Sequence, residues 1–217
     1  RLTDYCKGGK LPQKVRFGLA WDVTNGINID LDASAICLDK DLKCVDQVWF
    51  RQLRSHDGAI VHQGDEREGD EAGDDEKMDI ELSRVSESVQ YIGFVINSYS
   101  GQELDDVKRA SCHLFDPQTN EDMATYAMSN ADSVNGYTAL VVACLYRGAT
   151  PDQWNLCIIS EAAHGRTVQE NVDELQNHLR RFPPQIICND DDEEIVVEAE
   201  MPAFVPLEDE EIDLSKP

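Results

Sequence analysis

The strongest constraint on the fold is a succession of short apolar segments separated by turn signals. In residues 15–21, apolar side chains alternate with polar or small ones, which is the period of a half-buried strand. Comparable segments, bounded by turn dipeptides such as NG, DG, SG and DP, cover residues 30–38, 45–53, 59–62, 77–82, 89–99, 108–116, 123–128, 138–146 and 153–161. Roughly ten strands at such short spacing predict an all-β fold, an antiparallel sandwich or barrel.

One amphipathic helix is predicted after the last strand. Thr167 can cap its first turn, and Glu170, three residues later, completes a capping box. The apolar residues that follow recur at helical spacing up to Phe182, and Pro183 with Pro184 ends the pattern.

Three regions follow from this pattern. We expect an N-terminal extension over residues 1–14, a single domain over 15–182 and a tail over 183–217. The tail holds twelve acidic residues against one lysine, Lys216, and contains prolines, so we expect it to be disordered.

The charge and cysteine content limit the function. The formal net charge of −24 is concentrated in an internal loop and in the tail. Direct binding of DNA or RNA needs basic patches, so we do not expect it. Seven cysteines without a CxxC pair favour reduced thiols and a cytoplasmic location. The longest apolar run, near residues 139–146, is too short to cross a bilayer.

The internal acidic loop, Gly64–Glu76, is the strongest functional signal. It places eight carboxylates beside one cation, Arg67, with three glycines among them. Strand-like segments flank the loop on both sides. Like charges this close repel unless they are solvated or neutralised by a cation. A hard-cation site therefore explains the loop better than a flexible tail does.

A second acidic segment, NIDLDAS, precedes and enters the second predicted strand. If it is extended, Asn28, Asp30, Asp32 and Ser34 lie on one face and the apolar residues on the other. Asp22 ends the preceding strand, and we expect it at the same rim. Calcium takes six to eight oxygen ligands, often carboxylates with backbone carbonyls. These aspartates and the loop could supply such a shell, although acids at exposed strand ends can also be merely solvated.

Other candidate sites have simpler explanations. Ser55, His56 and Asp57 are sequence neighbours, which cannot form a catalytic triad, so SHDG is expected to be a turn. His62 is a possible ligand, but a strand histidine near a carboxylate is more often hydrogen-bonded. The three tryptophans, 21, 49 and 154, fall in strand patterns and are expected in the core.

Five segments together resemble the TerD family of tellurium-resistance and stress-response proteins. They are FGLAWD, DLDASA, LRSHDGAIVHQGDEREGDEAGDDE, GQELDDVKRASCHLFD and YRGATPDQWNLCII, in family order between about Val15 and Leu179. The resemblance implies a calcium-binding β-sandwich with two metal sites at one end and no established catalytic activity.

Carried over by position, the resemblance implies a set of acidic metal ligands: Asp22, Asp30, Asp32, Asp57, Asp65, Asp70, Asp74, Asp75 and Glu76. Some positions depart from the family pattern. Arg51 and Gln52 replace paired asparagines, Glu66 and Glu68 replace an asparagine and a threonine, and Gly69, Asp70 and Glu71 stand for GEG.

The acidic segments and the resemblance together imply a calcium-binding domain, with two Ca²⁺ ions, that acts as a stress-response adaptor or sensor and is not an enzyme. Protein partners are expected but not identified. One alternative is calcium-dependent docking on an anionic membrane surface. A second is a metal-dependent hydrolase, in which His62 is the obvious candidate for a general base.

Overall fold

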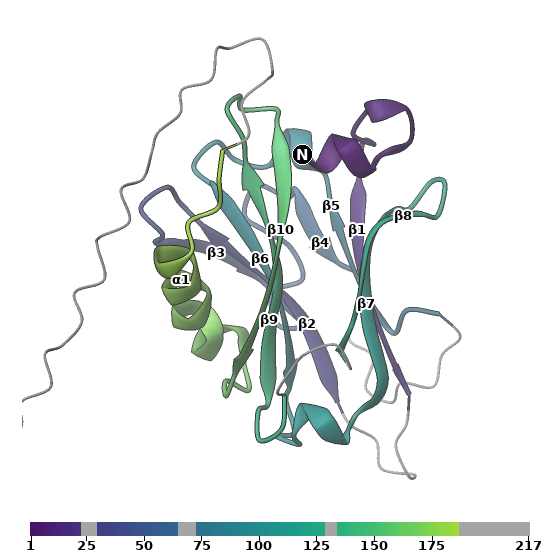
Figure 1. Cartoon of the computed structure of the whole chain (residues 1–217), viewed down its shortest axis with the longest axis vertical. Coiled ribbons are helices and arrows are strands. Elements are labelled where there is room, and N and C mark those ends of the chain that lie inside the picture. The colour runs from purple at the N-terminus through teal and green to yellow at the C-terminus, as the bar shows by residue number, and fades with distance from the viewer. Residues whose placement is uncertain (23–29, 65–72, 129–133, 187–217) are drawn as a thin grey trace, which may run out of the picture.

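The computed structural model describes residues 1–22, 30–64, 73–128 and 134–186. Ten described strands form two antiparallel five-stranded sheets that face each other (Figure 1). The first sheet has the order β4 (Ile60–His62), β5 (Glu76–Ile80), β1 (Val15–Asp22), β7 (Lys108–Asp116) and β8 (Glu121–Ala127). The second has the order β10 (Trp154–Ala163), β9 (Ala139–Arg147), β6 (Tyr91–Ser98), β2 (Leu31–Leu38) and β3 (Cys44–Val48). The predicted all-β sandwich is confirmed.

The main core lies between the two sheets. Phe17 of β1 stacks on Phe94 of β6 with ring centroids 4.6 Å apart. Trp21 and Trp154 are both buried in this core, as predicted. Leu2 is also buried there, and its short 3-10 helix, Leu2–Tyr5, contacts β8 and β10. The residues before β1 therefore pack against the sandwich.

A second apolar cluster lies on the outer face of the second sheet, beneath helix α1 (Val172–Arg181) (Figure 1). Leu175 and Leu179 are buried against this face. Gly93 of β6 lies directly under Leu175, where a Cβ atom would collide with the leucine methyl groups. The absence of a side chain at Gly93 thus permits the close approach of the helix.

The start of the helical region differs from the prediction. Residues Val168–Asn171 form a 3-10 turn, and α1 begins only at Val172. Thr167 makes no side-chain cap, and the Glu170 carboxylate accepts a hydrogen bond from the Arg166 backbone N–H at 2.7 Å. The predicted capping box is therefore wrong. Buried Asn171 orders the turn instead, through hydrogen bonds to Gly165 and Thr167.

The third predicted strand is too long. β3 ends at Val48, and Trp49 and Gln52 then close a two-residue turn through reciprocal backbone hydrogen bonds. Asp46 fixes the chain that follows, because its carboxylate accepts hydrogen bonds from the Gln52 amide and the His56 backbone N–H. Trp49 is only half-buried, against the outer apolar cluster rather than in the main core.

Three further short segments are 3-10 helices: Lys7–Gly9, Leu82–Arg84 and Leu104–Asp106. No helix in the described part of the chain is long and apolar enough to cross a bilayer. The six cysteines that the structure describes are all free thiols, in keeping with the prediction. Residues 187–217, most of the predicted tail, lie outside the described residues.

Candidate metal centre

Three strand ends bring most of the predicted ligands to one end of the sandwich. β1 and β5 are antiparallel with Leu19 opposite Glu76, so the end of β1 lies beside the start of β5. β2 starts at the same end, where the Asp30 carbonyl accepts a hydrogen bond from the Tyr99 N–H at 3.2 Å. The predicted ligands at this end of the sandwich are Asp22, Asp30, Asp32, Asp74, Asp75 and Glu76.

The carboxylate of Glu76 joins the two sheets. It is buried, and its Oε2 accepts a hydrogen bond of 2.5 Å from the backbone N–H of Ala33 in β2. β3 pairs with β2 only from Ala35 to Leu38, so no described strand lies beside the outer edge of β2 at Ala33. Glu76 takes the place of that strand by satisfying a backbone donor.

His62 of β4 satisfies the other backbone group of Ala33. Its Nε2 lies 3.1 Å from the Ala33 carbonyl and 3.4 Å from Glu76 Oε2. Its Nδ1 accepts a hydrogen bond from the Gly64 N–H at 3.3 Å, so Nε2 carries the proton and donates to the carbonyl. Both ring nitrogens of this buried side chain are therefore engaged, as the hydrogen-bonded interpretation predicts.

Asp75, the residue before β5, extends the backbone hydrogen bonding between β5 and β1 by one residue. Its N–H donates to the Leu19 carbonyl at 2.8 Å, and its Oδ2 accepts a hydrogen bond from the Trp21 N–H at 2.9 Å. The side chain is 8 % exposed. Asp75 is thus a nearly buried carboxylate whose orientation is fixed by the end of β1.

Asp74 is held on the outer face of the first sheet by His113. Asp74 Oδ1 lies 2.9 Å from His113 Nε2, and Asp122 Oδ1 lies 2.5 Å from His113 Nδ1. The hydrogen bond to Asp74, supported by the one to Asp122, raises the pKa of His113 above its ordinary value. Gly18 of β1 lies beneath this arrangement, where a Cβ atom would collide with Asp74 and His113.

Asp32 is buried on the outer face of the second sheet, while Leu31 and Ala33 face the main core. This is the predicted alternation. Asn97 of β6 donates from Nδ2 to Asp32 Oδ2 at 3.2 Å and to the Arg166 carbonyl at 2.8 Å. Asn97 Oδ1 is buried and has no hydrogen-bond partner among the residues that the structure describes.

Asp57 does not join the other predicted ligands. It precedes β4 near the far end of β5, since Ile60 pairs with Ile80. Its carboxylate accepts hydrogen bonds from Ser55 Oγ at 2.6 Å and from the Ala59 N–H at 2.9 Å, and a third from the Ser86 N–H at 2.7 Å. Partial burial alone would raise the pKa of Asp57, but these hydrogen bonds and nearby Arg84 hold it below its usual range.

The same contacts confirm that SHDG is a turn. The Gly58 N–H donates to the Ser55 carbonyl at 2.9 Å, and Gly58 has a φ of +70°. Ser55 Oγ donates to Asp57 rather than to His56, so these three residues do not form a catalytic triad.

Asp65 and Asp70 lie outside the described residues, as do Glu66, Glu68 and Asn28. Within the described residues, no three His, Cys, Asp or Glu side chains are grouped closely enough to hold a metal ion. The donors that the structure does place at this end are carboxylate and amide oxygens, which are the ligands that calcium prefers. The donor chemistry therefore fits a hard cation.

Sequence reasoning missed three residues of this end: Asn97, His113 and Asp122. Their strands were predicted, but the pairing of those strands was not. Asn97 reaches Asp32 because β6 pairs with β2, and His113 reaches Asp74 across Gly18 because β7 pairs with β1. Only a prediction of strand order would have found them.

Comparison with known proteins decides the family. The TerD domain model matches residues 6–177. The chain belongs to the TerD family. It is 35% identical over 168 residues to the tellurium resistance protein TerZ of Serratia marcescens, which covers 72% of this chain and 84% of that protein. It is 29% identical to the stress response protein SCP2 of Bacillus subtilis (strain 168), over 78% of this chain and 92% of the relative.

A solved structure shows the same fold. The crystal structure of a homologue of telluride resistance protein (TerD) from Streptomyces coelicolor A3(2) superimposes with a TM-score of 0.65 at 23% sequence identity. The match covers 76% of this TerD-family chain and 97% of the homologue. The chain is therefore a member of a tellurium-resistance and stress-response family with the sandwich fold of its relatives.

Proposed function

We propose that the acidic end of the sandwich binds calcium, and that the domain acts as a calcium-dependent adaptor or sensor in a stress response. The observation that carries the proposal is the position of six acidic residues at the ends of β1, β2 and β5, all at one end of the fold. Three of them, Asp32, Asp75 and Glu76, are buried. Buried carboxylates are costly unless positive charge or hydrogen bonds compensate them.

The kind of donor favours calcium over other metals. Zinc sites are built from cysteine thiolates and histidine nitrogens, but His62 uses both ring nitrogens within the protein. Magnesium needs fewer protein ligands and keeps more of its water. An excess of carboxylates spread over several segments suits the higher coordination number of calcium, and two ions remain our expectation.

The hydrogen bonds of this end give three of the carboxylates a fixed direction before any ion arrives. Backbone N–H groups hold one oxygen of Asp75 and one of Glu76, and His113 holds one oxygen of Asp74. Because Glu76 belongs to the first sheet and contacts the second, an ion bound beside it would strengthen a link between the sheets. Such coupling suits a domain whose surface changes with calcium, which is what an adaptor or sensor requires.

Calorimetric calcium titration of the full chain tests the proposal. Asp30→Ala and Asp75→Ala are each expected to weaken calcium affinity about tenfold or more, because each removes a charged ligand. Without metal the two variants should stay folded, since removal of one acid lowers like-charge repulsion. Asp57→Asn is the matched control, because Asp57 lies at the other end of β5. The calcium affinity of this variant should equal that of the natural chain. Normal calcium binding by both alanine variants would refute the ligand assignment.

The alternative function, a metal-dependent hydrolase, depends on His62 as a general base, and the hydrogen bonds of His62 argue against that role. His62, its candidate base, is buried and donates to the Ala33 carbonyl, while its Nδ1 accepts a hydrogen bond from Gly64. A general base needs a free nitrogen within reach of a proton to be abstracted.

One observation favours calcium-dependent membrane docking as a second candidate. Phe50 and Arg51 form the tip of the turn after β3, and the exposed Arg51 guanidinium donates to the Tyr99 hydroxyl at 2.9 Å. Tyr99 also contacts Asp30, so this tip lies beside the acidic end. Aromatic and basic side chains are enriched at membrane surfaces.

Sedimentation with vesicles separates the two candidates. If the tip docks on membranes, the protein should pellet with phosphatidylserine vesicles in calcium and not in chelator, and Arg51→Gln should reduce the bound fraction. Binding of calcium in solution without sedimentation would leave the adaptor or sensor as the function.

A further inference from the structure

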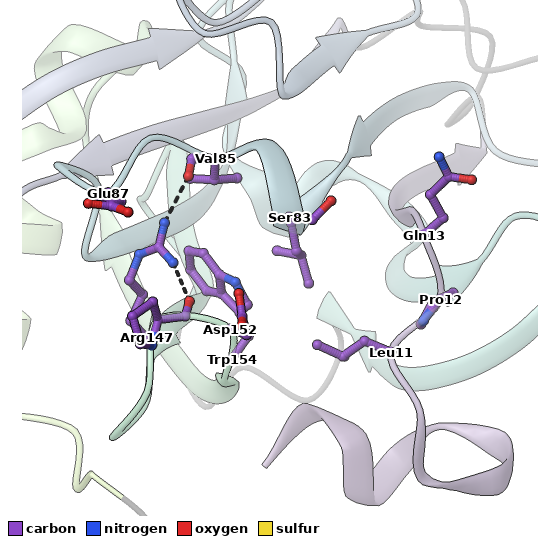
Figure 2. A pocket seen from close by; sticks show the side chains of 11 residues that line it. Leu11, Pro12, Gln13, Ser83, Val85, Glu87, Arg147, Asp152 and Trp154 are labelled. Carbon is purple, nitrogen blue, oxygen red and sulfur yellow. Dashed lines mark hydrogen bonds between the residues drawn. The ribbon is translucent and has the colours of Figure 1, made fainter.

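A cavity of about 340 Å³ lies at the end of the sandwich opposite the acidic end. Its walls come from three parts of the chain: Leu11–Gln13 before β1, the segment from Leu82 to Glu87, and the turn between β9 and β10. In Figure 2, Leu11 and Pro12 lie across the hollow from Trp154 and Arg147. The volume is within the range of pockets that hold small ligands.

Arg147 forms one wall of the cavity, but its guanidinium group already donates to backbone carbonyls. It is nearly buried, and its guanidinium lies 4.6 Å from the centre of the Trp154 ring. It donates to the carbonyls of Val85, Ser86, Val89 and Pro151 at 2.5–3.0 Å (Figure 2 shows two of these bonds). These bonds use four of its five N–H groups, so Arg147 cannot bind an anion in a bidentate manner.

The remaining polar groups of the cavity have no partner in the described part of the chain. Glu87 and Asp152 are exposed carboxylates without a hydrogen bond or an ion pair there, although both lie near the charge of Arg147. The indole N–H of Trp154 also donates to no described residue, and this side chain is only 2% exposed. This N–H is not among the fully buried polar atoms that lack a partner in the described residues, so it is open to the cavity, where a ligand oxygen can accept its hydrogen bond.

We propose that this cavity binds a small aliphatic amine that also carries a hydroxyl or carbonyl oxygen. The ammonium group pairs with Glu87 and Asp152, the oxygen accepts the Trp154 indole N–H, and the methylene chain contacts Leu11, Leu82 and Val85. The carboxylates of Glu87 and Asp152 at the cavity favour a cationic ligand over an anionic one. The proposal is independent of calcium, since the cavity and the acidic end lie at opposite ends of the fold.

Three probes of equal length test the chemistry: 5-aminopentan-1-ol, 1,5-pentanediol and 5-hydroxypentanoate. Each is titrated into the full chain while the indole N–H signals are followed by ¹H–¹⁵N NMR, once with calcium and once with chelator. The amine should shift the Trp154 signal with a Kd on the order of 1 mM, as expected for a ligand of this size. The signals of Trp21 and Trp49 serve as internal controls and should not move.

Two conservative variants test the carboxylates. Glu87→Gln and Asp152→Asn are exposed changes that should leave the fold intact and raise the Kd for 5-aminopentan-1-ol about tenfold each. Asp173→Asn, an exposed acid on α1, is the matched control and should bind as the natural chain does. The proposal is overturned if the Trp154 signal does not move, if the diol or the acid binds as tightly as the amine, or if neither variant weakens binding.

Discussion

Millimolar calcium is expected to raise the melting temperature of this domain by about 5–10 °C. An ion that binds only the folded state stabilises it by about 2.7 kcal/mol when its concentration is a hundred times the Kd. In a chain of this size each kcal/mol corresponds to a shift of about 2–4 °C. The physical source is the neutralisation of the negative charge that folding places at this end of the sandwich, where Asp30, Asp75 and Glu76 lie.

General screening of the negative charge must be separated from binding. Magnesium at the same concentration, and sodium chloride at matched ionic strength, should raise the melting temperature much less than calcium does. Addition of chelator should return the melting curve to its starting point. If magnesium and calcium stabilise equally, the acidic end is a diffuse cation-attracting surface and our assignment of a calcium site fails.

Replacement of Leu175 by alanine is expected to lower the free energy of unfolding by about 3 kcal/mol. Leu175 is fully buried on the outer face of the second sheet, with its methyl groups directly over Gly93. Loss of a buried leucine costs the transfer free energy of the missing groups and leaves a cavity, typically 2–5 kcal/mol in total. The absence of a side chain at Gly93 makes it harder for the sheet to fill the space.

Urea denaturation measures this loss, because a lower midpoint at an unchanged slope reports stability alone. Asp173→Ala is the control on the same helix: its side chain is exposed, so the change should be within about 0.5 kcal/mol. A loss of less than about 1 kcal/mol for Leu175→Ala would mean that α1 is loosely attached. The second sheet would then not depend on the helix for its outer cover.

Much of the fold was predictable because strand alternation and turn residues are local signals. The strand at residues 108–116 was predicted with the bounds that the structure shows, and residues 15–21 and 30–38 were nearly as close. The errors arose where a side chain redirected the backbone. Asp46 organises the turn that stops β3 at Val48, and Asn171 replaces the expected cap of the helix.

The all-β class, the two acidic segments and the resemblance to the TerD family can all be read from the amino-acid pattern. Which side chains contact one another follows only from the packed fold. It joined Glu76 and His62 to Ala33 in the facing sheet, linked His113 to Asp74 across Gly18, separated Asp57 from the rest, and placed Glu87 and Asp152 around one cavity with Trp154. The reason is physical. Alternation along a strand depends on neighbouring residues, whereas a partner across a sheet depends on strand order and register, which arise from the packing of the whole chain.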